Sequence, residues 1–367
     1  EVEAPAVYAA ADFGPYGRER DDGVAGALAA FDVDMQWTGS PYAVEPGAVV
    51  KDDGTPFQVF TPVSRAWVRH GWAPPVSPPG RIAWEGEVGG IPIPDAPDVE
   101  AALPAAGEEA ARRRWAAFSS EALDDYQAGR DRPAGDHTSR LSPYLKWGAI
   151  HPRTLLADID LRKPGDRAFR TELCWREFYA DVLWHHPESA RRALQPRMAS
   201  MELDTGRRAD ERFAAWASGR TGYPIVDAGM RQLLAEGWMH NRVRMIVASF
   251  LVKDLHLDWA RGARHFLRHL VDGDLASNNH GWQWVAGTGT DAAPYYRVFN
   301  PVTQGRKFDP EGAYVRAYVA ELAGLDAPAI HAPWETGATP AGYPAPIVDH
   351  PEERQEALRR YQAAREG

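Results

Sequence analysis

The sequence contains one cysteine, Cys174, among 367 residues. A single cysteine cannot form an intrachain disulfide, so a disulfide-stapled scaffold and a multi-cysteine metal site are both excluded. No run approaches the roughly 18 consecutive apolar residues that a membrane-spanning helix needs. The chain begins Glu-Val-Glu, without the basic start of a signal peptide. We therefore expect a soluble, cytoplasmic protein with no membrane partner.

Several catalytic signatures are also missing. There is no Gly-x-Ser-x-Gly elbow of a serine hydrolase and no Gly-x-x-x-x-Gly-Lys phosphate loop. His265 and His269 lie four residues apart, but no acidic residue completes a His-Glu-x-x-His motif, and we predict no metal site. The segment 287–291, Gly-Thr-Gly-Thr-Asp, lacks a lysine and is predicted to be a tight loop.

Positive charge is scarce overall, with 41 Lys and Arg against 51 Asp and Glu and a net charge of −10. Taken alone, this balance argues against binding a polyanion. Most of the deficit lies in residues 1–110, which carry 6 basic and 18 acidic residues, whereas residues 111–320 carry 31 and 25. The later part of the chain can therefore present a basic face to phosphate.

The composition is that of a globular protein, with 44% hydrophobic and 25% charged residues, and the length allows two to three compact units. Residues 1–72 are predicted to form part of an α/β unit, because a helix is expected over 22–31 between extended segments at 4–11, 33–37 and 57–60. Residues 73–106 are rich in Pro and Gly and are predicted to be an interdomain linker.

Residues 107–367 are predicted to form a second domain that is nearly all α. A helix begins near 107, where apolar residues follow an Ala, Arg and Glu-rich start, and Gly237 is placed to end another helix. Further helices are expected over 143–158, 167–184, 209–217, 224–236, 241–254, 260–270 and 310–321.

Two of these helices each carry a face that mixes polar and large apolar side chains. Glu172, Trp175 and Arg176 have the spacing i, i+3, i+4, as do Asn241, Arg244 and Met245. Such a face suits the half-buried wall of a ligand site, although an ordinary surface ion pair between Glu and Arg would show the same spacing.

Two further segments allow a structural and a functional interpretation. Hydroxyls between Thr138 and Ser142 are placed to cap a helix that has Pro143 in its first turn, and the same groups with an arginine make an anion site suited to a pyrophosphate. The Asp-Gly-Asp start of segment 272–284 is by itself typical of a turn.

Six segments occur together and in one order that resembles the photolyase/cryptochrome family, most closely the class I bacterial photolyases for cyclobutane pyrimidine dimers. The similarity runs from about residue 10 to the C-terminus. The segments are Thr138 to Leu145, Glu172 to Tyr179, Gly222 to Asp227, Gly237 to Arg242, Asp272 to Trp284 and Phe299 to Pro301.

The resemblance implies an incomplete, Rossmann-like α/β antenna domain at the N-terminus and an all-α C-terminal domain that binds FAD. It implies light-driven repair of DNA, in which excited, reduced FAD passes an electron to a cyclobutane pyrimidine dimer flipped out of the duplex. The partner would be damaged DNA, and we expect a monomer.

The resemblance also assigns residues around the cofactor. Asp272 would pair with Arg244, and Asn278 would face N5 of the flavin, where a neutral amide tolerates the anionic reduced ring. The residues expected to bind FAD are Tyr126, Thr138, Ser139, Arg140, Leu141, Ser142, Arg244, Asp272, Gly273, Asp274 and Asn278.

For the substrate, the resemblance implies that Trp175 and Trp284 form apolar walls around the flipped dimer. Glu172 and Asn241 would form hydrogen bonds with the pyrimidine edges, and Met245 would pack beside them. The arginines expected near DNA phosphates are Arg130, Arg242 and Arg297.

Trp282 and Trp259 match the first two members of the family's tryptophan chain for photoreduction. The third member would fall at Gly206, so the chain departs from the family pattern at its surface end. Trp216 is a candidate for the exit, and slow photoreduction is the alternative.

Two departures concern the antenna domain. The family's N-terminal strand and Arg-rich start are absent, so the sequence resembles a fragment that lacks the first part of this domain. The acidic residue of folate-binding members falls at Gly14 by ungapped count, which disfavours folate. A deazaflavin as the second, antenna chromophore, or no antenna at all, is expected instead.

Three alternatives stay open from the sequence. A cryptochrome would signal to a protein partner under blue light, but such proteins often replace the residue at Asn278 and add a long tail. A (6-4) photolyase would carry paired histidines where this chain has His240 and Asn241. A DNA-binding protein with a vestigial flavin pocket is the third, because fold does not fix function.

Overall fold

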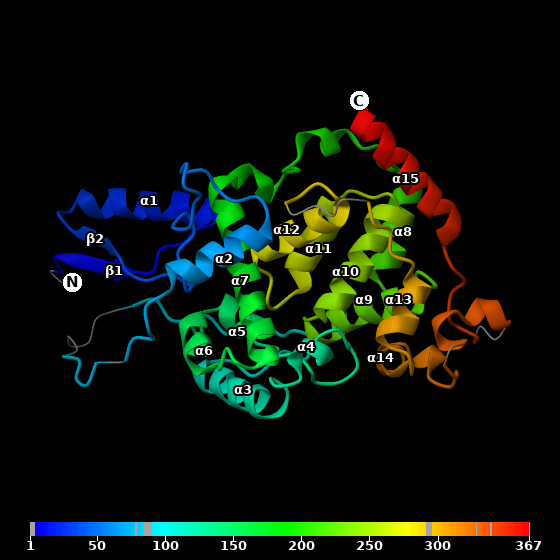
Figure 1. The fold of residues 1–367 in the computed structure, drawn as a ribbon, viewed down its shortest axis with the longest axis horizontal. Coiled ribbons are helices and arrows are strands. Elements are labelled where there is room, and N and C mark those ends of the chain that lie inside the picture. Colours follow the sequence, from blue (N-terminus) through cyan, green and yellow to red (C-terminus); the bar gives the residue numbers. More distant parts are fainter. Residues whose placement is uncertain are drawn as a thin grey trace.

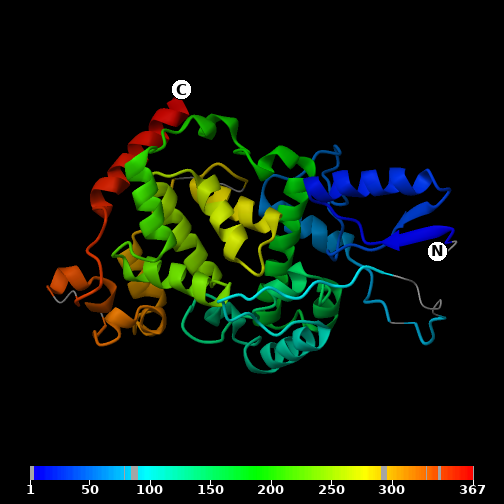
Figure 2. The same ribbon diagram turned by 180° about the vertical axis from the view of Figure 1, so that it is seen from behind.

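The computed structural model describes residues 4–77, 79–83, 90–290, 296–327, 329–337 and 340–366. A small unit of two strands and a helix projects from one end of a large helical body (Figure 1), and the view from behind shows the same arrangement (Figure 2). The main elements are β1 (Ala6–Ala9), α1 (Pro15–Ala29), β2 (Asp34–Trp37), α2 (Phe60–His70), α3 (Glu108–Glu121), α4 (Tyr126–Gly129), α5 (Ser142–Lys146), α6 (Pro152–Asp158), α7 (Pro164–His185), α8 (Arg207–Ala217), α9 (Pro224–Glu236), α10 (Asn241–Ser249), α11 (Trp259–His269), α12 (Leu275–Ala286), α13 (Pro301–Phe308), α14 (Ala313–Tyr318) and α15 (His350–Glu366).

The N-terminal unit contains a two-stranded parallel sheet, with Ala6 of β1 opposite Asp34 of β2. Parallel strands need a crossover of about a dozen residues, and the 15-residue helix α1 provides it. Both strands lie inside the first two segments expected to be extended. Helix α1 starts at Pro15, earlier than expected, because proline is favoured in the first turn of a helix.

The extended segment expected at 57–60 is wrong, since Phe60 begins helix α2. Val63, Ala66 and Trp67 follow Phe60 on one helical face, and all four side chains are buried. This face packs against α7, so a tertiary contact decides between helix and strand here.

Helix α2 shares its hydrophobic core with the helical body. The cluster contains Phe60 and Trp67 of α2 together with Trp115 of α3 and Phe178 of α7. The hydrophobic core is therefore continuous across the boundary expected after residue 72. The residues of the expected linker that the structure describes contain no helix or strand, and residues 84–89 of the linker lie outside the described part.

A main-chain segment, residues 40–47, is fastened to the body by side chains of α7 and of the start of α6; we call it the strap. Glu177 of α7 accepts hydrogen bonds from two strap N–H groups and from the indole of Trp67. A side chain at Gly47 would meet Trp184, which makes glycine necessary there. The other bonds join Ser40 to His151, Pro41 to Arg176, Ala43 to Arg153 and Gly47 to Asp181.

Most expected helices are present, and α9 ends at Gly237 in the left-handed conformation that a glycine C-cap predicts. The helix expected over 143–158 is instead two helices, α5 and α6. Gly148, with φ of 71°, and Pro152 separate them. The helix expected over 241–254 changes after Ser249 into a π-helical turn, Phe250–Asp254, labelled η3.

Helices α12, α13 and α15 had no counterpart in the sequence prediction. Helix α12 is rich in Ser, Asn, His and Gly, which have poor helix propensity, but Ala276, Trp282 and Gln283 bury its inner face. Among the described residues, no helix combines the length and apolarity required to span a bilayer.

Candidate functional site

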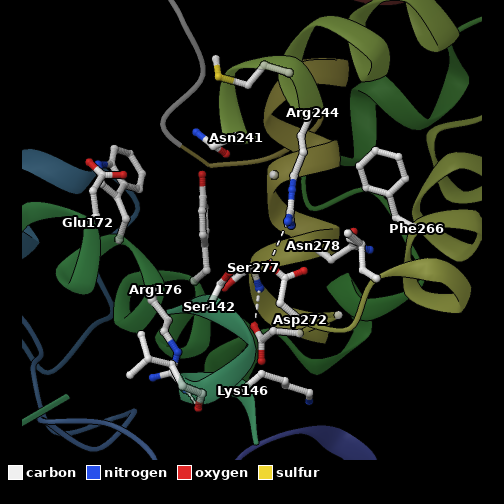
Figure 3. Close-up of a pocket in the computed structure, with 18 of the residues that line it drawn as sticks. Ser142, Lys146, Glu172, Arg176, Asn241, Arg244, Phe266, Asp272, Ser277 and Asn278 are labelled. Atoms are coloured by element: carbon white, nitrogen blue, oxygen red, sulfur yellow. Dashed lines mark hydrogen bonds and ion pairs between the residues drawn. The ribbon is translucent and has the colours of Figure 1, made fainter. Parts of the chain in front are cut away.

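A cavity of about 520 Å³ lies between the two hydrophobic cores. Its walls come from α4, α5 and α7 on one side and from α10, α11 and α12 on the other, and Figure 3 shows Glu172 and Asn241 toward one end with Ser142 and Lys146 toward the other. A cavity of this size suits a small molecule or cofactor. The predicted site residues that line it are Tyr126, Arg130, Ser139, Ser142, Glu172, Trp175, Asn241, Arg242, Arg244, Met245, Asp272, Gly273, Asp274, Asn278, Trp282 and Trp284.

The remaining predicted site residues do not line the cavity. They are Thr138, Arg140, Leu141, Trp216, Trp259 and Arg297.

Glu172 lies on the cavity face of α7 and forms an ion pair with Arg130, which follows α4. Both side chains are about 30% exposed, so the pair lies at the rim of the cavity rather than in a fully dry core. Burial raises the pKa of the Glu172 carboxyl, and the charge of Arg130 opposes that rise. A proton can therefore remain on Glu172 at a pH at which an exposed glutamate has lost it.

Trp175, one turn further along α7, stacks on Phe60 of α2, with ring centroids 3.6 Å apart and an interplanar angle of 5°. The stack holds the indole of Trp175 in one orientation at the cavity wall. Sequence reasoning missed Phe60, because an apolar residue assigned to a strand gives no sign of a tryptophan 115 positions later.

Helix α10 brings Asn241, Arg242, Arg244 and Met245 to the cavity. The helix is fixed at its start by His240, whose Nδ1 accepts a hydrogen bond from the main-chain N–H of Arg242. Burial lowers the pKa of His240 to about 4, so its ring is neutral and can accept this bond at neutral pH.

Arg242 forms an ion pair with Asp131, with 2.8 Å between Nη2 and Oδ1, and its guanidinium lies 4.4 Å from the ring of Phe308. Asp131 directly follows Arg130, so two arginine–carboxylate pairs lie side by side along the chain at the cavity rim. No local pattern marks Asp131 as a site residue, since 111 positions separate it from Arg242.

Asp272 is the most buried carboxylate of the cavity, with a side chain 1% exposed. Its Oδ2 lies 2.8 Å from Nη2 of Arg244, whereas its Oδ1 has no hydrogen-bond partner among the described residues. Arg244 also donates from Nε to the carbonyl of Met239, which fixes its guanidinium. The unpartnered, buried Oδ1 is an acceptor that a ligand N–H can satisfy.

The loop 272–274 leads into α12 through Asp274, whose Oδ1 accepts the N–H of Ser277 and caps the helix. The Asp-Gly-Asp segment is thus both a turn and part of the cavity wall. Four residues later, the Asn278 amide donates from Nδ2 to the Ala263 carbonyl and to Oδ1 of Asn279. These bonds use both amide hydrogens and leave the oxygen of Asn278 as the group for a ligand.

The segment 138–142 enters α5 differently from the expectation. The N-cap of α5 is Leu141, and no side chain caps the helix, so the predicted hydroxyl cap is wrong. Arg140 takes a left-handed conformation with φ of 48°, which turns the chain so that Ser139 and Ser142 reach the cavity while Thr138 does not. Arg114 of α3 holds this turn by donating to the carbonyls of Thr138 and Ser139.

Two cationic lining residues were given no role by the family resemblance, although Arg176 belongs to the face of α7 that was expected to form a ligand wall. Lys146 ends α5, and Arg176 of α7 donates to the strap carbonyl of Pro41 and to the carbonyl of Leu145. With Ser139 and Ser142, they give one part of the cavity hydroxyls and positive charge. This is the donor set that phosphate oxygens require.

Of the three tryptophans expected to carry electrons, only Trp282 lines the cavity. Trp282 lies at the cavity and is 3% exposed, and its ring centroid is 6.0 Å from that of Trp216. Trp216 is 0% exposed, so it does not reach the surface as an exit would. Trp259 begins α11 and is half-buried. Gly206 is the N-cap of α8 with φ of 79°, a conformation that tryptophan rarely adopts.

Arg297 is exposed and lies away from the cavity lining, and its carbonyl accepts a hydrogen bond from Lys253. Asp291, the end of the predicted 287–291 loop, falls outside the described residues. In the part of the chain that is described, no three His, Cys, Asp or Glu side chains converge as metal ligands would.

Comparisons with known proteins identify the family of the chain. Residues 169–363 match the family model "FAD binding domain of DNA photolyase", and residues 1–80 match "DNA photolyase". A relative from Alkalihalophilus pseudofirmus, called deoxyribodipyrimidine photo-lyase, is 41% identical over 97% of this chain and 78% of its own length.

Two solved structures extend the comparison to the fold. A class III photolyase from Agrobacterium tumefaciens superposes with a TM-score of 0.89 at 36% identity, covering 99% of this chain and 80% of the other. An archaeal photolyase from Sulfolobus tokodaii, solved with two FAD molecules, gives 0.80 at 29% identity, covering 98% and 79%. The helical body with its central cavity is thus a photolyase fold, and the chain belongs to the photolyase/cryptochrome family.

Proposed function

We propose that this protein is a deoxyribodipyrimidine photolyase, which repairs cyclobutane pyrimidine dimers in DNA under light. The observation that carries the proposal is one cavity that joins two unlike ends. One end has the buried Arg244–Asp272 pair and the hydroxyl and cationic groups near α5, and the other has tryptophans with Glu172 and Asn241. The first end suits a flavin nucleotide and the second a stacked pair of bases.

The residues present fit FAD. The orphaned Oδ1 of Asp272 is an acceptor for a ring N–H, and the Arg244–Asp272 pair gives the site fixed charge beside it. Ser139, Ser142 and the cations Lys146 and Arg176 would hold the phosphates. When bound and reduced, FAD supplies the electron that splits the dimer after it absorbs blue or near-UV light.

The chain's own residues would bind and orient the dimer. Trp175, held by its stack on Phe60, and Trp284 supply apolar walls. Glu172 and Asn241 would form hydrogen bonds with the pyrimidine edges, and Met245 would pack beside them. A proton held on Glu172 would stabilise negative charge that develops on a dimer carbonyl.

DNA outside the cavity would be held by arginines. Arg130 and Arg242 lie at the rim, and Arg297 is an exposed residue that precedes α13. Their contacts to phosphate would set the register of the duplex without reading its sequence. Both rim arginines are paired with carboxylates in the structure, which keeps their guanidinium groups oriented.

Electrons for reduction of the cofactor would pass through Trp282, which lines the cavity, with Trp259 as the next member and Trp216 as a buried side branch. The turn that presents Ser139 and Ser142 to FAD would be formed by the main chain of Thr138, Arg140 and Leu141. Tyr126 and Gly273 line the cavity and would also contact FAD.

For the remainder of the molecule, we propose that residues 1–72 are part of a Rossmann-like antenna domain, 73–106 the linker and 107–367 the domain for FAD and DNA. The parallel β1–α1–β2 unit supports the first assignment. A second chromophore would be bound there, a deazaflavin rather than folate. We further propose a monomer, and a cytoplasmic protein because its substrate is DNA.

The test is repair of an oligonucleotide that carries one thymine cyclobutane dimer by the reduced protein under blue light, with a dark control. Light-dependent restoration of the thymines is expected. Trp284→Ala should retain the yellow cofactor and weaken binding of dimer-containing DNA by about 1–3 kcal/mol. Bound flavin without repair would contradict the proposal and favour a cryptochrome-like photoreceptor.

A further inference from the structure

The π-helical turn η3 carries a buried lysine that the proposed chemistry does not use. Lys253 is 4% exposed, and its Nζ donates to the main-chain carbonyl of Arg297 at 2.5 Å and lies 4.2 Å from the ring of Tyr296. Isolated π-helical turns occur frequently at functional sites. The amino group thus fastens the main chain at an exposed residue.

A second bond fastens the same short segment. The N–H of Phe299 donates to Oγ of Ser249 at 3.3 Å, and Ser249 is the last residue of α10, four positions before Lys253. Residues 296–299 are therefore held by two side chains from the continuous rod formed by α10 and η3. The start of this rod carries Asn241 and Arg242 at the cavity, so one rigid element supports both the cavity rim and the segment with Arg297.

Burial of a lysine side chain at this position is unfavourable. Burial lowers the pKa of Lys253 to about 7, because the charged form loses hydration and Arg297 repels it, although Asp254 partly compensates. Asp254 itself is bound to His350 of α15, and among the described residues no carboxylate forms a hydrogen bond with Lys253 to offset its burial. A methionine would fill the same space without this loss of hydration. In return, the amino group of Lys253 forms the hydrogen bond to the carbonyl of Arg297.

We propose that Lys253 is a positioning residue for DNA binding. By fixing the main chain at Arg297, it holds the Arg297 guanidinium where a phosphate beside the flipped dimer lies. The inference rests on the proposed function, because it takes a DNA duplex as the partner of Arg297. Lys253 acts through Arg297 and touches neither cofactor nor substrate.

The experiment compares Lys253→Met, Arg297→Ala and the double variant in the full-length, FAD-loaded protein. Binding of a duplex with one thymine dimer is measured by fluorescence anisotropy over a range of salt concentrations. Each single variant should bind about fivefold more weakly and should reduce the slope of log affinity against log salt by about 0.9, the value for one phosphate contact. The double variant should match Arg297→Ala alone.

Three controls separate positioning from a general structural effect. Lys163→Met removes the same charge at the surface, where Lys163 pairs with Asp124, and should leave binding unchanged. Single-turnover repair of the bound dimer and the flavin spectrum should be unchanged in Lys253→Met. Ser249→Ala removes the other hydrogen bond to residues 296–299 and should also weaken DNA binding. This variant keeps the test available if Lys253→Met fails to fold.

Additive losses in the double variant, or an unchanged salt slope in both Lys253→Met and Ser249→Ala, would overturn the positioning role. If wild-type protein binds and repairs the dimer while these variants behave like it, this inference alone fails. If wild-type protein shows no light-dependent repair, the proposed function itself fails.

Discussion

Glu172 forms an ion pair with Arg130 in the structure and would contact the dimer in the proposed complex. Glu172→Ala should therefore lower repair more than binding. The lost carboxyl no longer stabilises charge on the dimer, while Arg130 becomes free to contact phosphate. We expect repair per bound dimer to fall by at least about tenfold. Loss of one hydrogen bond that forms in a transition state typically lowers a rate by about 100- to 1000-fold.

The measurement is single-turnover repair beside an anisotropy titration, with the exposed Glu108→Ala as the control for loss of a surface carboxylate. Equal losses in repair and in binding would mean that Glu172 serves only to hold the substrate.

Asn278 presents its oxygen to the cavity because both amide hydrogens are used within the chain. Asn278→Asp places a negative charge in a cavity that already contains Asp272 and Asp274. The anionic reduced flavin should become harder to form, and the midpoint potential of the bound flavin should fall by tens of millivolts, where about 59 mV is tenfold for one electron. A potentiometric titration measures this, and an unchanged potential would rule out the electrostatic role.

At this scale the motifs predicted most of the cavity, since side chains such as Trp175, Arg244 and Asp272 belong to compact segments with recognisable spacing. The residues that hold them did not show in the sequence. Phe60 and Asp131 contact the site from far along the chain, and nothing in their local pattern distinguishes them from ordinary core and surface residues. Pairing across more than 100 positions leaves no periodic signal.

Helices α11 and α12 pack closely because α11 has a glycine where the indole of Trp282 lies. A Cβ at Gly262 would be 2.2 Å from Cη2 of Trp282. Gly262→Ala should therefore displace Trp282, lower the free energy of unfolding by about 1–3 kcal/mol and slow light-driven flavin reduction.

Denaturant unfolding and the rate of flavin reduction under blue light check this expectation. Gly26→Ala in α1, where a Cβ meets nothing within 4 Å, is the matched control and should be neutral or slightly stabilising. A Gly262→Ala variant as stable as the parent would show that Trp282 has room to move.

An element was predicted correctly where the residues at its own ends carry the signal, and was missed where tertiary contacts decide its structure. Helix α9 was predicted with its ends because Pro224 starts it and Gly237 ends it, both local signals. Helix α2 and the change from α10 to η3 depend on tertiary contacts, such as the packing of Phe60 and Trp67 on α7, which propensity does not contain.

At the scale of the whole molecule, the strap joins the N-terminal part of the chain to the cavity-bearing body. Glu177 is its centre, since both carboxylate oxygens accept N–H groups and the side chain is buried. Glu177→Gln keeps the size but turns one acceptor into a donor, which leaves at least one buried N–H unpaired. The free energy of unfolding should fall by about 1–3 kcal/mol.

Thermal and denaturant unfolding of the FAD-loaded protein measure this loss, beside Glu121→Gln, an exposed glutamate at the end of α3. Because strap and body share one core, a single transition is expected in both variants. Equal stability of the two variants would show that water replaces the lost bond.

The strap also decides how far the protein can be shortened. Residues 4–39 form the small sheet and α1 and contact the body at Trp184 through Phe13 and Arg18, whereas residues 40–70 supply main-chain groups and apolar side chains that close one side of the hydrophobic core. Since Arg176 both lines the cavity and holds Pro41, a cut downstream of Ser40 would loosen the wall of the cofactor site itself. A minimal light-responsive version should thus begin upstream of Ser40.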